Sequence, residues 1–112
     1  MWIITEDVLF PCHENTTWFV YKTDDCPIDL TKPIDLDEVR ALMPYKFRLM
    51  GDDGDVAYIG YCSTLNLTDE WGREILSPLD WAGPHVGCTI MQQFVETKTV
   101  SVQVDIWETI YG

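Results

Sequence analysis

Residues 45–62 carry the pattern that most constrains the fold. Tyr45–Met50 alternates large apolar side chains with basic ones, which is the two-residue period of a strand with one buried face. Gly51–Asp55 then supplies two glycines and three aspartates, the residue types of a tight turn. Val56–Cys62 follows as an apolar run. Two strands joined by so short a turn pair antiparallel, so the sequence predicts a β-hairpin here.

Other segments are also typical of strands. Trp2–Thr5 is a short apolar run, and Thr16–Tyr21 is β-branched and aromatic. Thr89–Val95 is a third strand, and Glu96–Lys98 turns the chain. Apolar and polar residues then alternate from Val100 to Ile106, and the strand Thr99–Ile110 is predicted to be central or near-central in the sheet. Four side chains of that strand are expected on the buried, helix-covered face: Val100, Val102, Val104 and Ile106.

One helix is expected at Asp35–Met43. Asp35 suits the N-cap and Glu38 stands three residues on, as in a capping box. Pro44 ends the helix. An apolar stripe at helical spacing is expected to pack on the sheet: Leu36, Val39, Leu42 and Met43.

Ser63–Gly87 has no firm pattern. Thr68–Leu76 has the composition of a helical turn weakened by Gly72. Ser77–Gly87 contains two prolines and two glycines: Pro78, Gly83, Pro84 and Gly87. We expect Ser77–Gly87 to be irregular. The whole chain, residues 1–112, is therefore predicted to be a single α+β domain. Its mostly antiparallel β-sheet has five or six strands, with one short helix packed on a face.

Charge limits the partners of this fold. Asp and Glu number 19 against 7 Lys and Arg, a formal net charge of −12 on 112 residues. Such a chain repels nucleic acid and anionic membranes and attracts cationic proteins. Lys46, Arg48 and Lys98 are not expected to form a basic patch. The opening MWIITEDVLF has no basic region typical of a signal peptide, so a cytoplasmic protein with reduced thiols is expected.

Two acidic loops are the candidate partner-binding site. Asp52, Asp53 and Asp55 also suit a hard cation, but a hairpin turn already accounts for them. We therefore assign both loops to a cationic protein partner. The candidate residues are Asp24, Asp25 and Asp29 in one loop and Asp52, Asp53 and Asp55 in the other.

Cysteine and histidine residues offer weaker candidates. Cys12, His13, His85 and Cys88 have the atoms of a zinc site, although their spacing matches no known finger. Asp80, His85 and Cys88 have the residue types of a thiol triad. Packed cysteines explain both sets, so no cofactor and no catalytic residue are expected. Trp71, Trp81 and His85 either line a small-ligand pocket or hold a long loop on the core.

Three stretches resemble a recurrent group of small proteins of bacteria, phages and mobile elements that has no assigned activity. They are WIITEDVLF, KFRLMGDDGDVAYIGYC and LSPLDWAGPHVGCTIMQQ. The chain departs from that group at Trp81 and His85 and in the stretch 12–33. The resemblance implies one sheet-rich domain of mobile-element origin and no catalytic residue.

These observations lead to three functional hypotheses. The first is a non-enzymatic acidic interaction protein, an inhibitor or DNA mimic that binds a cationic protein partner. The alternative is a small-ligand binding module that uses the Trp71–His85 loop, as a homodimer. The third is a small hydrolase or metalloprotein built on Asp80, His85 and Cys88.

Overall fold

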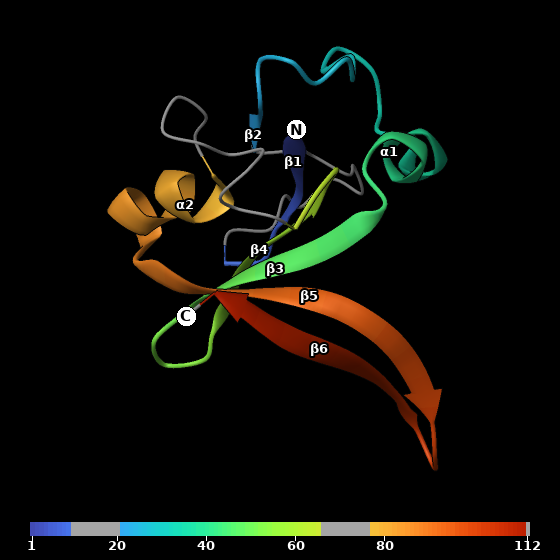
Figure 1. The fold of residues 1–112 in the computed structure, drawn as a ribbon, viewed down its shortest axis with the longest axis vertical. Helices are drawn as coiled ribbons and strands as arrows, with labels where there is room; N and C mark the ends of the chain where they lie inside the picture. Colours follow the sequence, from blue (N-terminus) through green and yellow to red (C-terminus); the bar gives the residue numbers. More distant parts are fainter. Residues whose placement is uncertain (10–20, 66–76, 112) are drawn as a thin grey trace.

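The computed structural model describes residues 1–9, 21–65 and 77–111. Within them, six strands form one antiparallel sheet in the order β2-β1-β4-β3-β5-β6 (Figure 1). This confirms the α+β class and the mostly antiparallel sheet. The strands are β1 (Trp2–Asp7), β2 (Tyr21–Lys22), β3 (Tyr45–Gly51), β4 (Val56–Cys62), β5 (Cys88–Thr99) and β6 (Gln103–Tyr111), and the helices are α1 (Leu36–Leu42) and α2 (Pro78–Val86).

The β3–β4 hairpin confirms the pattern at residues 45–62. Phe47 pairs with Gly60 and Lys46 with Tyr61. Gly54 adopts a φ of 86° in the turn, a conformation that suits glycine because it has no Cβ. The predicted strand Trp2–Thr5 is also present as the first part of β1. Of the predicted strand Thr16–Tyr21 only Tyr21 lies in the described residues, and the predicted turn at Thr68–Leu76 lies outside them.

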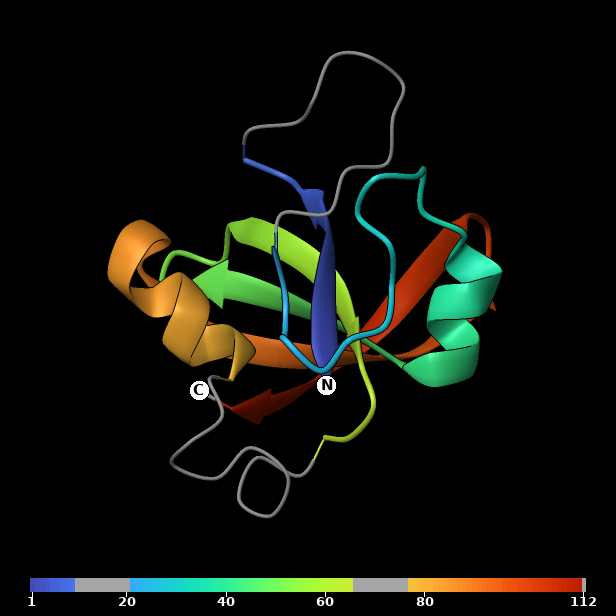
Figure 2. The ribbon, with the colours of Figure 1, turned by 90° about the horizontal axis from the view of Figure 1, so that it is seen from above.

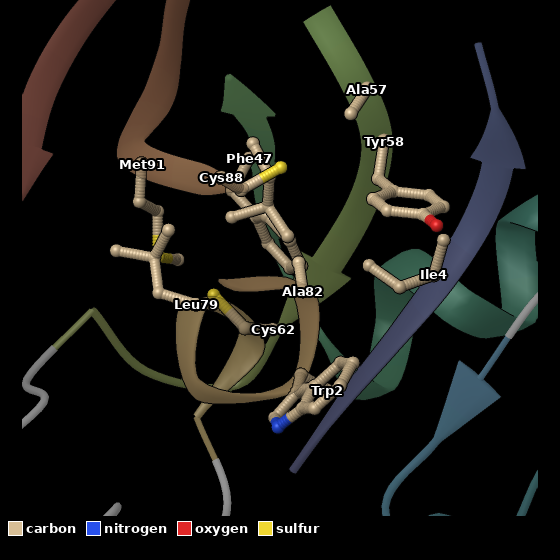
Figure 3. Packing of buried hydrophobic residues seen from close by; sticks show 11 residues of the cluster. Trp2, Ile4, Phe47, Ala57, Tyr58, Cys62, Leu79, Ala82, Cys88 and Met91 are labelled. Atoms are coloured by element: carbon tan, nitrogen blue, oxygen red, sulfur yellow. The ribbon is translucent and has the colours of Figure 1, made fainter. Parts of the chain in front are cut away.

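The main core lies between the sheet and α2. Trp2 and Ile4 of β1 pack with Phe47 and Leu49 of β3, and Leu79 and Ala82 of α2 close the cluster (Figure 3). The sheet side chains share one face because strand residues alternate between faces. Helices α2 and α1 lie on opposite sides of β1, as Figure 1 and Figure 2 both show.

Helix α1 covers part of the other face. Asp35 is its N-cap and accepts from the backbone N–H groups of Asp37 and Glu38, as expected from the sequence. Val39 and Met43 are fully buried in a cluster with Ile3 and Tyr61. The expected burial of Leu36 and Leu42 is wrong, since each is 36% exposed. Within this short helix only Val39 is buried, together with the C-cap residue Met43. Leu36 and Leu42 lie on either side of Val39 along the helix and remain partly in contact with solvent.

The expectation of irregular structure at Ser77–Gly87 is wrong. Ser77 and Asp80 form a capping box at the start of α2, and Pro78 occupies the first turn. A backbone N–H at that position would have no acceptor within the helix, so proline can stand there without loss of a hydrogen bond. Gly87 ends the helix at φ 69°, a left-handed C-cap. The helix contains Pro84. Pro78 and Gly87 therefore stand at the two ends of the helix, whereas Gly83 and Pro84 lie within it.

The last two strands also differ from the prediction. β5 continues through the expected turn at Glu96–Lys98 to Thr99, and the chain reverses at residues 100–102. β6 is the last strand of the sheet and not a central one. Three valines expected on the buried face are exposed: Val100 by 84%, Val102 by 66% and Val104 by 44%. Ile106 is half-buried.

The position of Val104 gives a stability prediction. Val104→Asp should change the free energy of unfolding by no more than about 0.5 kcal/mol, as surface substitutions usually do. Lys98 lies directly opposite on β5 and favours the new carboxylate. Val39→Asp is the matched control, because Val39 is fully buried and an unpaired buried carboxylate is very costly. Urea unfolding checks both; a large loss in Val104→Asp would contradict the exposed edge.

Candidate functional site

The β5–β6 arm, residues 95–106, projects from the body of the molecule. β5 pairs with β3 only from Cys88 to Gln93, whereas its pairing with β6 continues to Thr99. Beyond Gln93 the sheet is therefore two strands wide, and this extension reaches the lower end of the long axis in Figure 1. The register shifts between Phe94 and Glu96, and such a bulge bends a strand.

The arm is rich in exposed apolar side chains. Four of the ten exposed large apolar residues in the described chain lie on it: Val95, Val100, Val102 and Val104. One side-chain hydrogen bond joins its two strands: Thr97 Oγ1 of β5 donates to Asp105 Oδ1 of β6 at 2.8 Å. The ion pair of Lys98 Nζ with Glu96 Oε1, at 3.6 Å, lies within β5. The arm is thus a two-stranded extension of the sheet with four solvent-exposed valine side chains.

A cationic and aromatic cluster holds the base of the arm. Phe94 and Trp107 stand opposite each other on β5 and β6, with ring centroids 5.6 Å apart in an edge-to-face arrangement. The Arg48 guanidinium lies 4.3 Å from the Trp107 centroid, and Lys46 Nζ lies 5.5 Å from that of Phe94. Cations over aromatic faces are attracted by the ring quadrupole. We define these four side chains as the cation–aromatic cluster.

Arg48 is fixed by further polar contacts. Its Nε donates to Gln92 Oε1 at 2.7 Å, and Gln92 Nε2 donates to Thr109 Oγ1 at 3.0 Å. Partial burial lowers the pKa of Arg48, and the nearby Asp105 carboxylate opposes that shift. This cluster was not predicted from the sequence, which indicated no basic patch. Strand alternation places Lys46 and Arg48 on one face, but their aromatic partners come from distant strands.

The two predicted acidic loops are separate. Asp24, Asp25 and Asp29 lie in the loop between β2 and α1, and Asp52, Asp53 and Asp55 lie in the β3–β4 turn; all six are exposed. Figure 1 places the first loop at the upper end of the molecule and the turn at the lower left. The structure therefore does not bring the six aspartates onto one surface.

Several of these aspartates also shape their own loops. Asp29 Oδ1 accepts from the hydroxyl and backbone N–H of Thr31, and these bonds lower the pKa of Asp29. Asp53 accepts from the backbone N–H of Asp55, and Thr89 donates its hydroxyl to Asp52. Local hydrogen bonding of this kind is what makes aspartate common in turns.

Trp81 packs as part of the core. Its ring lies 4.8 Å from Tyr58, 5.3 Å from Tyr21 and 5.8 Å from Trp2, measured between centroids. The surrounding rings therefore occupy much of its aromatic surface. This packing favours the interpretation that Trp81 fixes a segment onto the core. Trp71 lies outside the described residues, and of His85 only its place in α2 is described.

The possible catalytic and metal residues have structural roles where they are described. Asp80 caps α2. Cys88 is buried, and burial raises the pKa of its thiol, which is the reverse of what a reactive thiolate needs. Cys12 and His13 lie outside the described residues. Elsewhere in the described chain, no group of three or more His, Cys, Asp and Glu side chains is arranged to hold a metal ion.

Comparisons with known proteins give no further constraint on the site. Neither the protein-family models, nor the curated proteins, nor the solved structures contain a match to this chain. Among the described residues, no helix is long and apolar enough to cross a membrane.

Proposed function

We propose that this protein is a non-enzymatic binding module that engages a partner protein through the β5–β6 arm. One observation carries the proposal: a two-stranded extension of the sheet exposes Val95, Val100, Val102 and Val104 to solvent. Leaving such side chains in water forgoes the free energy of their burial. Grouped exposed apolar residues commonly mark protein-binding sites.

The partner is a cationic protein. The net charge of −12 draws such a protein toward the molecule and raises the rate of association, while the valines supply apolar contact after the encounter. A nucleic-acid-binding groove has the required charge, so the proposed role includes inhibition of such a protein by imitation of the charge of DNA. The exposed acidic loop between β2 and α1 and the β3–β4 turn are the steering elements.

The apolar contact can be tested by a double substitution at the tip of the arm. Val100→Ser/Val102→Ser should abolish specific capture of partner proteins from a bacterial lysate, the source that the sequence resemblance implies. The matched control is Leu9→Ser/Leu30→Ser, since these leucines are also exposed, by 45% and 49%, but lie away from the arm. Captured proteins are identified by mass spectrometry. Equal capture by both double variants would contradict the proposal.

The electrostatic contribution needs two separate triple variants, because the loops lie apart. One replaces Asp24, Asp25 and Asp29 by Asn, and the other replaces Asp52, Asp53 and Asp55. Asn keeps an acceptor oxygen, so the loop hydrogen bonds survive. With the captured partner purified, we expect the association rate to fall in at least one triple variant and to fall with salt in the wild type. Association rates that respond neither to the Asn substitutions nor to salt would contradict the proposed electrostatic contribution to binding.

A further inference from the structure

The two edges of the described sheet differ in length and composition. The edge strand β2 has two residues, Tyr21 and Lys22, whereas β6 at the other edge has nine. Natural edge strands are commonly short or carry Lys or Pro, which discourages pairing with another chain. The sequence of β6, QVDIWETIY, contains neither residue. Among the described residues no strand pairs with the outer side of β6, so this edge can take a further strand.

The charges of β6 are all negative. Asp105 and Glu108 are its only charged residues, and both are exposed. They stand three positions apart, so they point to opposite faces of the sheet. Within the described chain neither is in an ion pair, and Arg48 approaches β6 only from the side of β3, with β5 in between. A strand added at the outer edge would therefore meet one acid on each face.

We propose that β6 takes up a basic β-strand of the cationic partner, paired antiparallel with its outer edge. This inference rests on the proposed function and adds how the partner is held. Because β6 is one of the two strands of the arm, its outer edge is continuous with the exposed valines. Backbone hydrogen bonds supply affinity in such strand addition, and side chains supply specificity.

Charge complementarity identifies the strand that fits. Opposite charges directly across an antiparallel pair stabilise it, and like charges destabilise it. Asp105 and Glu108 therefore favour a strand with two basic residues three positions apart. Apolar side chains fit between them, opposite Ile106 and Trp107. A second copy of this chain is disfavoured, because its own β6 would bring two more acids to the pair.

The probe for this edge is the blocked peptide TKFVKVT. Aligned antiparallel with residues 103–109, it places its two lysines opposite Asp105 and Glu108. The peptide TEFVEVT is the control, with two acids in place of the lysines. An NMR titration measures the dissociation constant and shows which amides shift. TKFVKVT should bind with shifts centred on β6, more weakly as NaCl rises from about 50 to about 500 mM, and TEFVEVT should not bind.

Two methylated peptides test for backbone pairing. In an antiparallel pair only alternate residues of a strand direct their N–H groups at a given neighbour. One version of TKFVKVT is therefore N-methylated at its even residues and the other at its odd residues. Only one of the two should lose binding. Equal behaviour of both would mean a purely electrostatic contact and would overturn strand addition.

A pair of double variants tests the two acids. Asp105→Asn/Glu108→Gln should raise the dissociation constant of TKFVKVT about fivefold. The matched control is Glu6→Gln/Glu38→Gln, which changes the net charge equally at exposed positions on β1 and α1. It should change the dissociation constant by less than about twofold. Circular dichroism checks that each variant is folded. Equal effects of the two double variants would contradict recognition by β6.

The remaining outcomes separate this inference from the proposed function. Lysate capture that depends on Val100 and Val102, without any binding of TKFVKVT, would overturn strand addition and leave the proposed function standing. NMR diffusion that shows a dimer of the chain alone, with β6 at its interface, would assign the edge to a second copy and would also overturn it.

Discussion

Replacing Trp2 by alanine should lower the free energy of unfolding by about 3–5 kcal/mol, the usual cost of truncating a buried aromatic side chain. Trp2 is fully buried. Its ring stacks on Tyr21 at 4.8 Å and lies 5.8 Å from Trp81. Removing it would leave a cavity between β1, β2 and α2, which these rings hold together. The predicted loss is a large share of the roughly 5–15 kcal/mol that stabilises a typical domain.

Trp107→Ala is the control for this prediction. It also removes one tryptophan, but Trp107 is only half-buried and belongs to the cation–aromatic cluster at the base of the arm. Urea unfolding followed by circular dichroism should give a clearly smaller loss of stability for Trp107→Ala than for Trp2→Ala. Equal losses would mean that the arm contributes as much to stability as the main core.

The elements that sequence analysis located correctly have strong local signals. The hairpin at residues 45–62 combines strand alternation with a glycine that suits its positive φ, and Asp35 marks the start of α1. Local signals do not reveal which neighbours are available for burial. Leu36 and Leu42 match the apolar stripe as well as Val39 does, yet the sheet buries only Val39 of the three.

The errors at residues 77–111 have two physical causes. Pro78 and Gly87 disfavour a helix interior but are suited to its first turn and its end, so composition alone gave the wrong state. The alternation at residues 99–106 passes through the reversal at residues 100–102 without a break, because valine also occupies the turn. Alternation indicates a strand but not what covers it, and here nothing in the described chain covers Val100 or Val102.

Prediction of the candidate site also required the strand order and the neighbours of each side chain in the folded chain. The acidic residues were visible in the sequence, but only the sheet order separates their two loops and makes β6 an edge. The cation–aromatic cluster joins β3, β5 and β6 through side chains as much as 61 residues apart. Such contacts follow from strand order and register, which one sequence without an alignment does not determine.

Gly60→Ala should destabilise the fold by about 1–3 kcal/mol, the usual cost of adding atoms to a packed interior. A Cβ on Gly60 would stand 2.3 Å from the Ile3 carbonyl oxygen and 2.8 Å from Phe47 Cζ. The first contact is with backbone, so β1 itself would have to shift. Gly54→Ala is the control: a Cβ there meets nothing within 4 Å, although its φ of 86° makes any side chain strained.

A double variant separates the two contacts at Gly60. Phe47→Leu removes the ring atom that approaches Gly60 but leaves the Ile3 carbonyl oxygen in place. If the backbone contact dominates, Gly60→Ala should cost nearly as much stability in the Phe47→Leu background as in the wild type, measured by urea unfolding as a double-mutant cycle. Full relief by Phe47→Leu would show instead that the ring alone excludes a side chain at residue 60. The first result would identify the close approach of β1 to β4 as the reason that this central strand contains a glycine.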